Sequence, residues 1–94
     1  MAIVHFASAD TEKLFKRQHA KAFGPDVRKT GLKKLLILHA ATSLVDLRVP
    51  PGNGLEALTG NRAGQHSIRV NDQFRVCFRW DGSNAHDVEI VDYH

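Results

Sequence analysis

The second half of the chain alternates apolar and polar residues with a period of two. The alternation runs through residues 66–70 and, more strongly, through residues 73–80, and a third such segment spans residues 85–93. Between these segments, residues 71–72 and 81–84 consist of Asn, Asp, Gly and Ser, which favour turns. Consecutive strands joined by short turns predict an antiparallel meander.

The first half of the chain is patterned as helices. After a short apolar strand at residues 3–6, Ser8 and Asp10 are candidate N-caps of a helix that we expect to end at the Gly-Pro pair of residues 24–25. Asp26 is placed to cap a second helix. The apolar residues of this helix share one face and its lysines point away from that face, with Leu32, Leu35, Leu36 and His39 on the first side and Lys29, Lys33 and Lys34 on the other.

Residues 49–54 join the two halves. Their two prolines and two glycines exclude regular structure. No repeat and no long linker divides the chain. We therefore expect a single α+β domain over residues 1–94, in which two N-terminal helices pack on one face of a small, mainly antiparallel, twisted sheet.

Burial of one sheet face fixes which strand residues point toward the helices. A shift of one residue would expose the whole apolar set, which consists of Ile68, Val70, Phe74, Val76, Phe78, Trp80, Val88 and Ile90. The simplest pairing of the last two strands sets Phe78 beside Val88 and Val76 beside Ile90. On the opposite surface, Arg79 then faces Asp87, and Arg75 falls between Glu89 and Tyr93.

The same parity places Arg69 near Arg75 on the two preceding strands. Like charges side by side on a sheet destabilise it unless an anion is near. In one interpretation, Glu89 and Asp87 neutralise the arginines as ordinary surface pairs. In the other, the open face is shaped for phosphate, which arginine binds with its planar fork. The register alone leaves both interpretations open.

Composition adds charge and location to this picture. The chain has 94 residues and a formal net charge of +3, and many of its 13 Lys and Arg lie in a few runs, which suits a polyanion or an acidic partner. On the first helix, Lys13, Lys16 and Arg17 form a basic stripe, either as a solvated face or as phosphate contacts to RNA. The chain start lacks a secretion signal and no run reaches the roughly 18 apolar residues of a membrane span, so we expect a cytoplasmic protein without membrane contact.

Metal and thiol chemistry receive little support. Cys77 is the only cysteine and lies in an apolar run, so no internal disulfide forms and a buried, inert thiol is expected. The candidate metal ligands are His86, Asp87, Asp92 and His94. Their spacing matches no recognised metal-binding pattern. We expect neither a metal nor a cofactor.

The stretches LEALTGNRAGQHSIRVNDQFR (residues 55–75) and VEIVDYH (residues 88–94) closely resemble the HigB branch of the RelE toxin superfamily. The similarity covers nearly the whole chain and is strongest from residue 48 onward. It implies a RelE-like fold and a toxin that cleaves mRNA on the 70S ribosome without a metal. It also implies a monomeric toxin that is silenced within a hetero-oligomer by a HigA-like helix-turn-helix antitoxin, encoded beside it.

By this resemblance, the active-site positions of the family fall on Arg75, Asp92, Tyr93 and His94. A further position that is often His falls on Glu56, and a nearby Lys position falls on Thr59, so the sequence departs from the pattern twice. Asp92 is expected to orient His94 or contact the message. Tyr93 is expected to stack on a base or donate its phenol proton.

RNA cleavage without a metal requires three protein groups. One takes the proton of the ribose 2′-OH, another protonates the departing 5′-oxygen, and a cation stabilises the charge at phosphorus. Arg75 suits the cation, with Arg69 and Arg79 as further phosphate contacts. His94 is the expected proton carrier, as acid or as base, because imidazole titrates near neutral pH. Glu56 is then the complementary base or orients the substrate.

Two other functions remain open at this point. The ParE branch of the same superfamily shares the architecture but poisons DNA gyrase without catalysis, and fold alone does not settle function. An RNA-binding accessory domain without toxicity would also keep the basic faces. The terminal Asp92, Tyr93 and His94 favour the nuclease branch.

Overall fold

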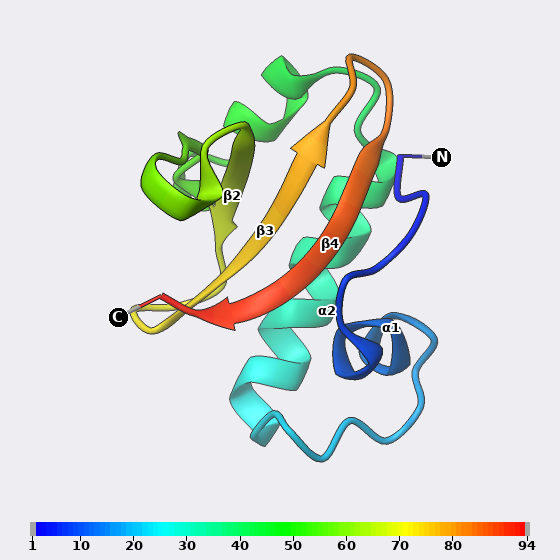
Figure 1. The fold of residues 1–94 in the computed structure, drawn as a ribbon. Coiled ribbons are helices and arrows are strands. Elements are labelled where there is room, and N and C mark those ends of the chain that lie inside the picture. Colours follow the sequence, from blue (N-terminus) through cyan, green and yellow to red (C-terminus); the bar gives the residue numbers. More distant parts are fainter. Residues whose placement is uncertain (1, 94) are drawn as a thin grey trace.

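The computed structural model describes residues 2–93 and is an α+β fold. Two helices, α1 (Ala9–Phe15) and α2 (Pro25–Ala40), precede a four-stranded sheet, as Figure 1 shows. Its antiparallel strands follow the order of the sequence, which is β1 (Glu56–Ala57), β2 (Gln65–Arg69), β3 (Phe74–Trp80) and β4 (Ala85–Asp92). Three short 3-10 helices lie between α2 and β2, namely η1 (Leu44–Arg48), η2 (Pro51–Asn53) and η3 (Gly60–Arg62). Of these, η2 lies in the joint, where no regular structure was expected. The expected fold class is confirmed.

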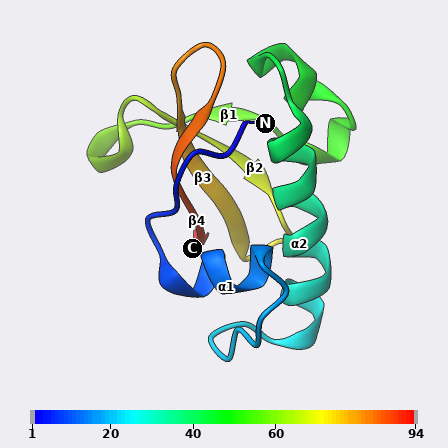
Figure 2. The ribbon, with the colours of Figure 1, turned by 90° about the vertical axis from the view of Figure 1, so that its right-hand side faces the viewer.

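Both helices lie on the same side of the sheet. In Figure 2, α2 runs along the sheet and α1 crosses near one end of β4. The core between the layers contains fully buried side chains from α2 and the strands, among them Leu35, Leu38, Ile68, Val76, Phe78 and Val88. Gly31 permits this close packing, because a Cβ there would come within 2.9 Å of the Ile90 side chain.

The first helix is shorter than its apolar pattern indicates. Ser8 is the N-cap, and its hydroxyl accepts the Thr11 N–H at 3.3 Å, whereas Asp10 lies inside the first turn. The helix ends at Phe15 instead of continuing to residue 24, since Arg17 adopts a left-handed φ of 59° that breaks the helix. Thr11 also anchors α1 to the sheet, because its hydroxyl accepts the Ile90 N–H at 2.9 Å.

Two residues of α2 lie on faces opposite to the expected ones. Lys34 is buried rather than solvated, and its Nζ donates to Asn53 Oδ1 at 2.6 Å. Asn53 in turn donates to backbone carbonyls of the joint, so this lysine secures the joint to the helix. Leu36 is 40% exposed rather than part of the core. His39 is structural, as its Nδ1 accepts the Ile3 N–H at 3.3 Å.

The strand register follows the expected parity with one irregularity. Val76 pairs with Ile90, as predicted, but the partners of Cys77 and Arg79 are Glu89 and His86. One extra β4 residue is therefore accommodated opposite Phe78, and Asp87 takes a left-handed φ of 53° at this bulge. The predicted direct pairing of Arg79 with Asp87 is wrong, although their side chains still meet.

The N-terminal segment and the first strand of the sheet also differ from expectation. Residues 3–6 form no full strand but two isolated parallel bridges to β4, from Ile3 to Ala85 and from Phe6 to Val88. β1 was not predicted, because two residues are too short for a periodic signal. Its pairing with β2 places Glu56 directly opposite Ser67.

Candidate active site on the open face of the sheet

The sheet face turned away from α2 carries the polar residues of the strands. Directly opposed residues of antiparallel strands point to the same side, so the register defines rows across this face. One row consists of Glu56, Ser67, Cys77 and Glu89, and the next consists of Arg69, Arg75 and Val91. We call this surface the arginine face, after Arg69, Arg75 and Arg79.

Arg75 is fixed by three neutral groups. Its Nε donates to the fully buried Ser67 hydroxyl at 2.6 Å, and its Nη2 donates to the Gly54 carbonyl. Its guanidinium carbon also lies 6.0 Å from the centre of the Tyr93 ring. Within residues 2–93 no carboxylate pairs with it, so its position is fixed while its charge is left uncompensated.

Gly54 lies beside Arg75 and adopts a left-handed φ of 52°, which favours glycine. A Cβ there would lie 3.7 Å from Arg75 Nη2, an ordinary contact distance, so the backbone conformation and not the available space explains the glycine. The joint that Lys34 secures to α2 therefore supplies one of the acceptors that hold Arg75.

Arg69 lies directly opposite Arg75, as predicted. It pairs with Asp72, whose side chain is 94% exposed in the turn between β2 and β3. An ion pair this exposed is screened by water and compensates the charge of Arg69 only weakly. Two guanidinium groups thus lie together at one end of the arginine face.

The interpretation that Glu89 neutralises Arg75 is wrong. Glu89 instead pairs with Arg62 of η3, whose Nη2 lies 2.9 Å from Glu89 Oε1. The neutralisation expected from Asp87 does occur, but for Arg79, whose Nε donates to Asp87 Oδ2 at 2.6 Å. Arg79 lies four residues after Arg75 on β3. A carboxylate compensates the charge of Arg79, whereas none within residues 2–93 compensates the charge of Arg75.

Sequence reasoning gave no role to Arg62. Its side chain extends from the loop over the arginine face, where Nη1 donates to Gln65 Oε1 at 3.0 Å and Nη2 to Glu89. The hydrogen bond with Glu89 raises the pKa of Arg62. The only sequence feature that could have drawn attention to Arg62 is its place in a turn between two glycines, Gly60 and Gly64. Both glycines have positive φ in the structure. Nothing local points from it to a carboxylate 27 residues away.

The predicted catalytic residues are gathered in part. Glu56, Arg75 and Tyr93 share the arginine face, since Glu56 opposes Ser67 and Tyr93 lies against Arg75. Asp92 ends β4 opposite Phe74, and its carboxylate accepts the Gln73 side-chain N–H at 2.8 Å. His94 lies outside the residues that the structure describes.

The basic stripe of α1 is separate from the arginine face. Of the three residues predicted to form a helical stripe, only Lys13 lies in α1, which packs against α2 and β4 on the helical side of the sheet (Figure 2). Lys16 is the C-cap and Arg17 follows the helix with a left-handed φ, so the predicted stripe is wrong in this part. Lys16 pairs with Glu12 at 2.8 Å, and both side chains are about half exposed. These residues could attract a polyanion but do not adjoin Arg75.

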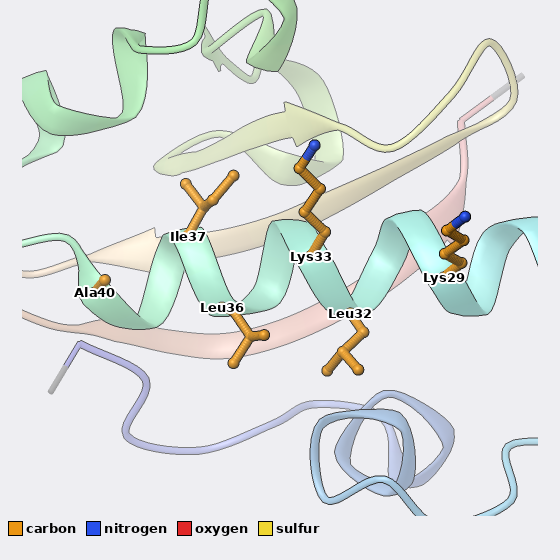
Figure 3. A pocket seen from close by; sticks show the side chains of 6 residues that line it. All are labelled: Lys29, Leu32, Lys33, Leu36, Ile37 and Ala40. Carbon is orange, nitrogen blue, oxygen red and sulfur yellow. The ribbon is translucent and has the colours of Figure 1, made fainter.

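An open groove on α2 has a volume of about 480 Å³ and contains none of the residues of the arginine face. Its side chains follow one helical stripe, as Figure 3 shows, and consist of Lys29, Leu32, Lys33, Leu36, Ile37 and Ala40. It offers no carboxylate or imidazole for acid–base catalysis. Residues 2–93 contain no group of three or more His, Cys, Asp or Glu placed to hold a metal ion.

A family comparison decides the identity of the chain. Residues 4–94 match the family described as the RelE-like toxin of the type II toxin-antitoxin system HigB. The chain belongs to this HigB-like toxin family. None of the helices within the described residues is long and apolar enough to cross a membrane.

Relatives of this HigB-like toxin support the assignment over part of their length. Toxin HigB-1 of Vibrio cholerae is 56% identical over 48 residues, which cover 51% of this chain and 50% of that protein. An uncharacterized protein of Haemophilus influenzae is 34% identical over 56 residues, which cover 60% of this chain and 55% of that protein. The matched part thus spans about half the length of each relative.

Proposed function

We propose that this HigB-like toxin is an endoribonuclease that cleaves mRNA on the 70S ribosome and thereby inhibits translation. One observation carries the proposal: the guanidinium of Arg75 is fixed by the Ser67 hydroxyl, the Gly54 carbonyl and the Tyr93 ring, and no carboxylate of residues 2–93 neutralises it. A rigid, uncompensated guanidinium beside a second arginine is suited to the dianionic phosphorane-like charge of RNA cleavage.

In the proposed reaction, the ribose 2′-oxygen attacks phosphorus and the bond from phosphorus to the 5′-oxygen breaks. A base takes the 2′-OH proton, an acid returns a proton to the 5′-oxygen, and a 2′,3′-cyclic phosphate remains. Glu56 and His94 are the candidates for these two proton transfers. Arg75 and Arg69 bind the phosphate oxygens, and the reaction needs neither a metal nor a cofactor.

The remaining candidates act on the message around the reacting phosphate. Tyr93 stacks on a base or donates its phenol proton, which its position over Arg75 supports. Asp92 orients His94 or contacts the message. Arg79 and the α1 stripe contact phosphates of RNA outside the reacting bond.

The proposal also states where the toxin acts, in which oligomeric state, and what inhibits it. A single domain over residues 1–94 acts in the cytoplasm as a monomer on the ribosome. A HigA-like helix-turn-helix antitoxin holds it in a silent hetero-oligomer, which the family membership supports.

The test is to induce the chain in bacteria and map the 5′ ends of cellular mRNA. We expect new ends inside translated codons with the natural chain and with Arg48→Ala, an exposed arginine of η1, and none with Arg75→Ala. DNA breaks with intact messages would instead identify a gyrase poison and overturn the proposal. The folded state of each variant is checked by circular dichroism.

A further inference from the structure

Glu89 is the carboxylate best placed to neutralise Arg75. Arg75 pairs with Val91, and Glu89 lies two residues before Val91 on β4, so the two charged residues are diagonal neighbours on one face. Diagonal neighbours on adjacent strands lie about 7–8 Å apart, within reach of long side chains. A Glu and an Arg at this spacing would ordinarily form an ion pair.

The charges around Cys77 show how closely these groups gather. Cys77 pairs with both Ser67 and Glu89, and burial raises the pKa of its thiol. The same thiol is also within the electrostatic influence of Arg62, Glu89 and Arg75. Arg62, Glu89 and Arg75 are therefore all near Cys77 on the arginine face.

Arg62 holds the carboxylate of Glu89. Its ion pair with Glu89 spans 2.9 Å, with exposed side-chain fractions of 31% and 22%, and is therefore less screened than the other arginine pairs, whose side chains are more exposed. Gln65 fixes the other end of the guanidinium at 3.0 Å. Both terminal nitrogens of Arg62, Nη1 and Nη2, are thus engaged with protein groups.

We infer that Arg62 is a positioning residue that sequesters Glu89 and so keeps the charge of Arg75 available for a phosphate of the RNA. The inference rests on the role of Arg75 in the proposed function. Without Arg62, Glu89 is left as a partly buried, unpaired carboxylate. Arg75, its diagonal neighbour on β3, is then available to pair with it, and the carboxylate of that pair repels the incoming phosphate.

The experiment is a double-mutant cycle on RNA binding. The probe is a short oligoribonucleotide with 2′-O-methyl groups, which lacks the attacking hydroxyl, and binding is followed by fluorescence anisotropy at low salt. We expect Arg62→Gln to weaken binding about tenfold, because a carboxylate is left beside the bound phosphate. Arg62→Gln combined with Glu89→Gln should return the affinity to within about twofold of the natural chain.

Two further variants keep the inference falsifiable if Arg62→Gln does not fold. Arg62→Lys retains a cation for Glu89 and should bind nearly as the natural chain does. Glu89→Gln should bind at least as tightly, because it removes a negative charge. A tenfold loss with Glu89→Gln would show that the pair acts through the fold and would overturn the inference.

The remaining outcomes separate other roles from this one. If the double variant stays as weak as Arg62→Gln, Arg62 contacts RNA itself or supports the structure, and the inference fails. It also fails if Arg62→Gln binds normally. The double-mutant cycle could also give the expected affinities while programmed ribosomes with the natural chain show no message cleavage. That result would support the sequestration of Glu89 and contradict the proposed nuclease function.

Discussion

The protein carries positive charge in two regions that differ in how the charge is held. At and just after the end of α1, Lys13, Lys16 and Arg17 lie within five positions of one another, and Lys16 pairs with the half-exposed Glu12. On the arginine face, Arg75 is held by the side chain of Ser67 and the backbone of Gly54. The first region offers charge in a solvated, adaptable form, and the second offers it in one fixed place.

This difference separates attraction from chemistry. Exposed lysines raise the local concentration of a polyanion, but their side chains must be ordered when it binds. A guanidinium already fixed by hydrogen bonds stabilises developing charge without that reorganisation. The arginine face therefore fits a catalytic role and the α1 stripe fits a steering role, although the two carry similar numbers of cations.

The largest expected effect is the loss of Arg75. Arg75→Ala should lower the single-turnover rate of message cleavage on programmed ribosomes by about 10²–10³-fold, the usual cost of one charge-stabilising donor. Arg75→Lys should recover only part of this, because an ammonium cannot bind two oxygens as a planar fork does. Arg48→Ala serves as the control. An Arg75→Ala variant that is folded and fully active would contradict the role of the arginine face.

The next effect tests whether fixation matters apart from charge. Ser67→Ala keeps every cation but removes the buried hydroxyl that accepts Arg75 Nε. We expect a loss in cleavage rate of about tenfold and a loss in unfolding free energy of about 1 kcal/mol. The rate and the unfolding transition are measured on the same preparation. A normal rate would mean that Arg75 needs no preset position, and the comparison of the two regions would lose its basis.

The sequence predicts features that depend on burial of one sheet face better than features that depend on local backbone conformation. Strand parity was predicted correctly because one buried face leaves a single choice, and so the juxtaposition of Arg69 and Arg75 followed. The end of α1 was not predictable in this way, because helical periodicity continues past Arg17 while the backbone turns left-handed there.

The missed features depend on partners far away along the chain. Lys34 is buried where its ammonium donates a hydrogen bond to Asn53, 19 residues later, and nothing in the helical pattern distinguishes it from Lys33. Arg62 becomes part of the site only through Glu89. The bulge at Asp87 shifts the pairing of Arg79 without any glycine or proline to mark it. Local propensity and periodicity contain no information about such contacts.

A smaller effect is expected from the α1 stripe. The triple variant Lys13→Ala, Lys16→Ala and Arg17→Ala should slow cleavage only two- to fivefold or so at physiological salt. The loss should grow as salt is lowered and disappear at high salt, since the contribution comes from screened, long-range attraction. The salt dependence of the apparent second-order rate is the measurement. A loss that does not change with salt would place these residues in specific contacts and remove the contrast with the arginine face.

The smallest effect on cleavage is expected at Arg79, because Asp87 already compensates its charge. Arg79→Ala should change the rate at neutral pH by less than about threefold.

The effect of Arg79→Ala on stability depends on pH. The hydrogen bond from Arg79 holds the pKa of the Asp87 carboxyl below its ordinary value of 3.8, and the nearby His5 and His86 act in the same direction. Because the folded pKa lies below the unfolded one, this pair stabilises the fold above the ordinary pKa and loses that effect as the pH falls through the lowered value. The melting temperatures of the natural chain and Arg79→Ala should therefore differ near neutral pH and converge as the pH falls through the lowered pKa of Asp87. A constant difference down to low pH would mean that Arg79 stabilises the sheet by packing, and that its charge is as free as that of Arg75.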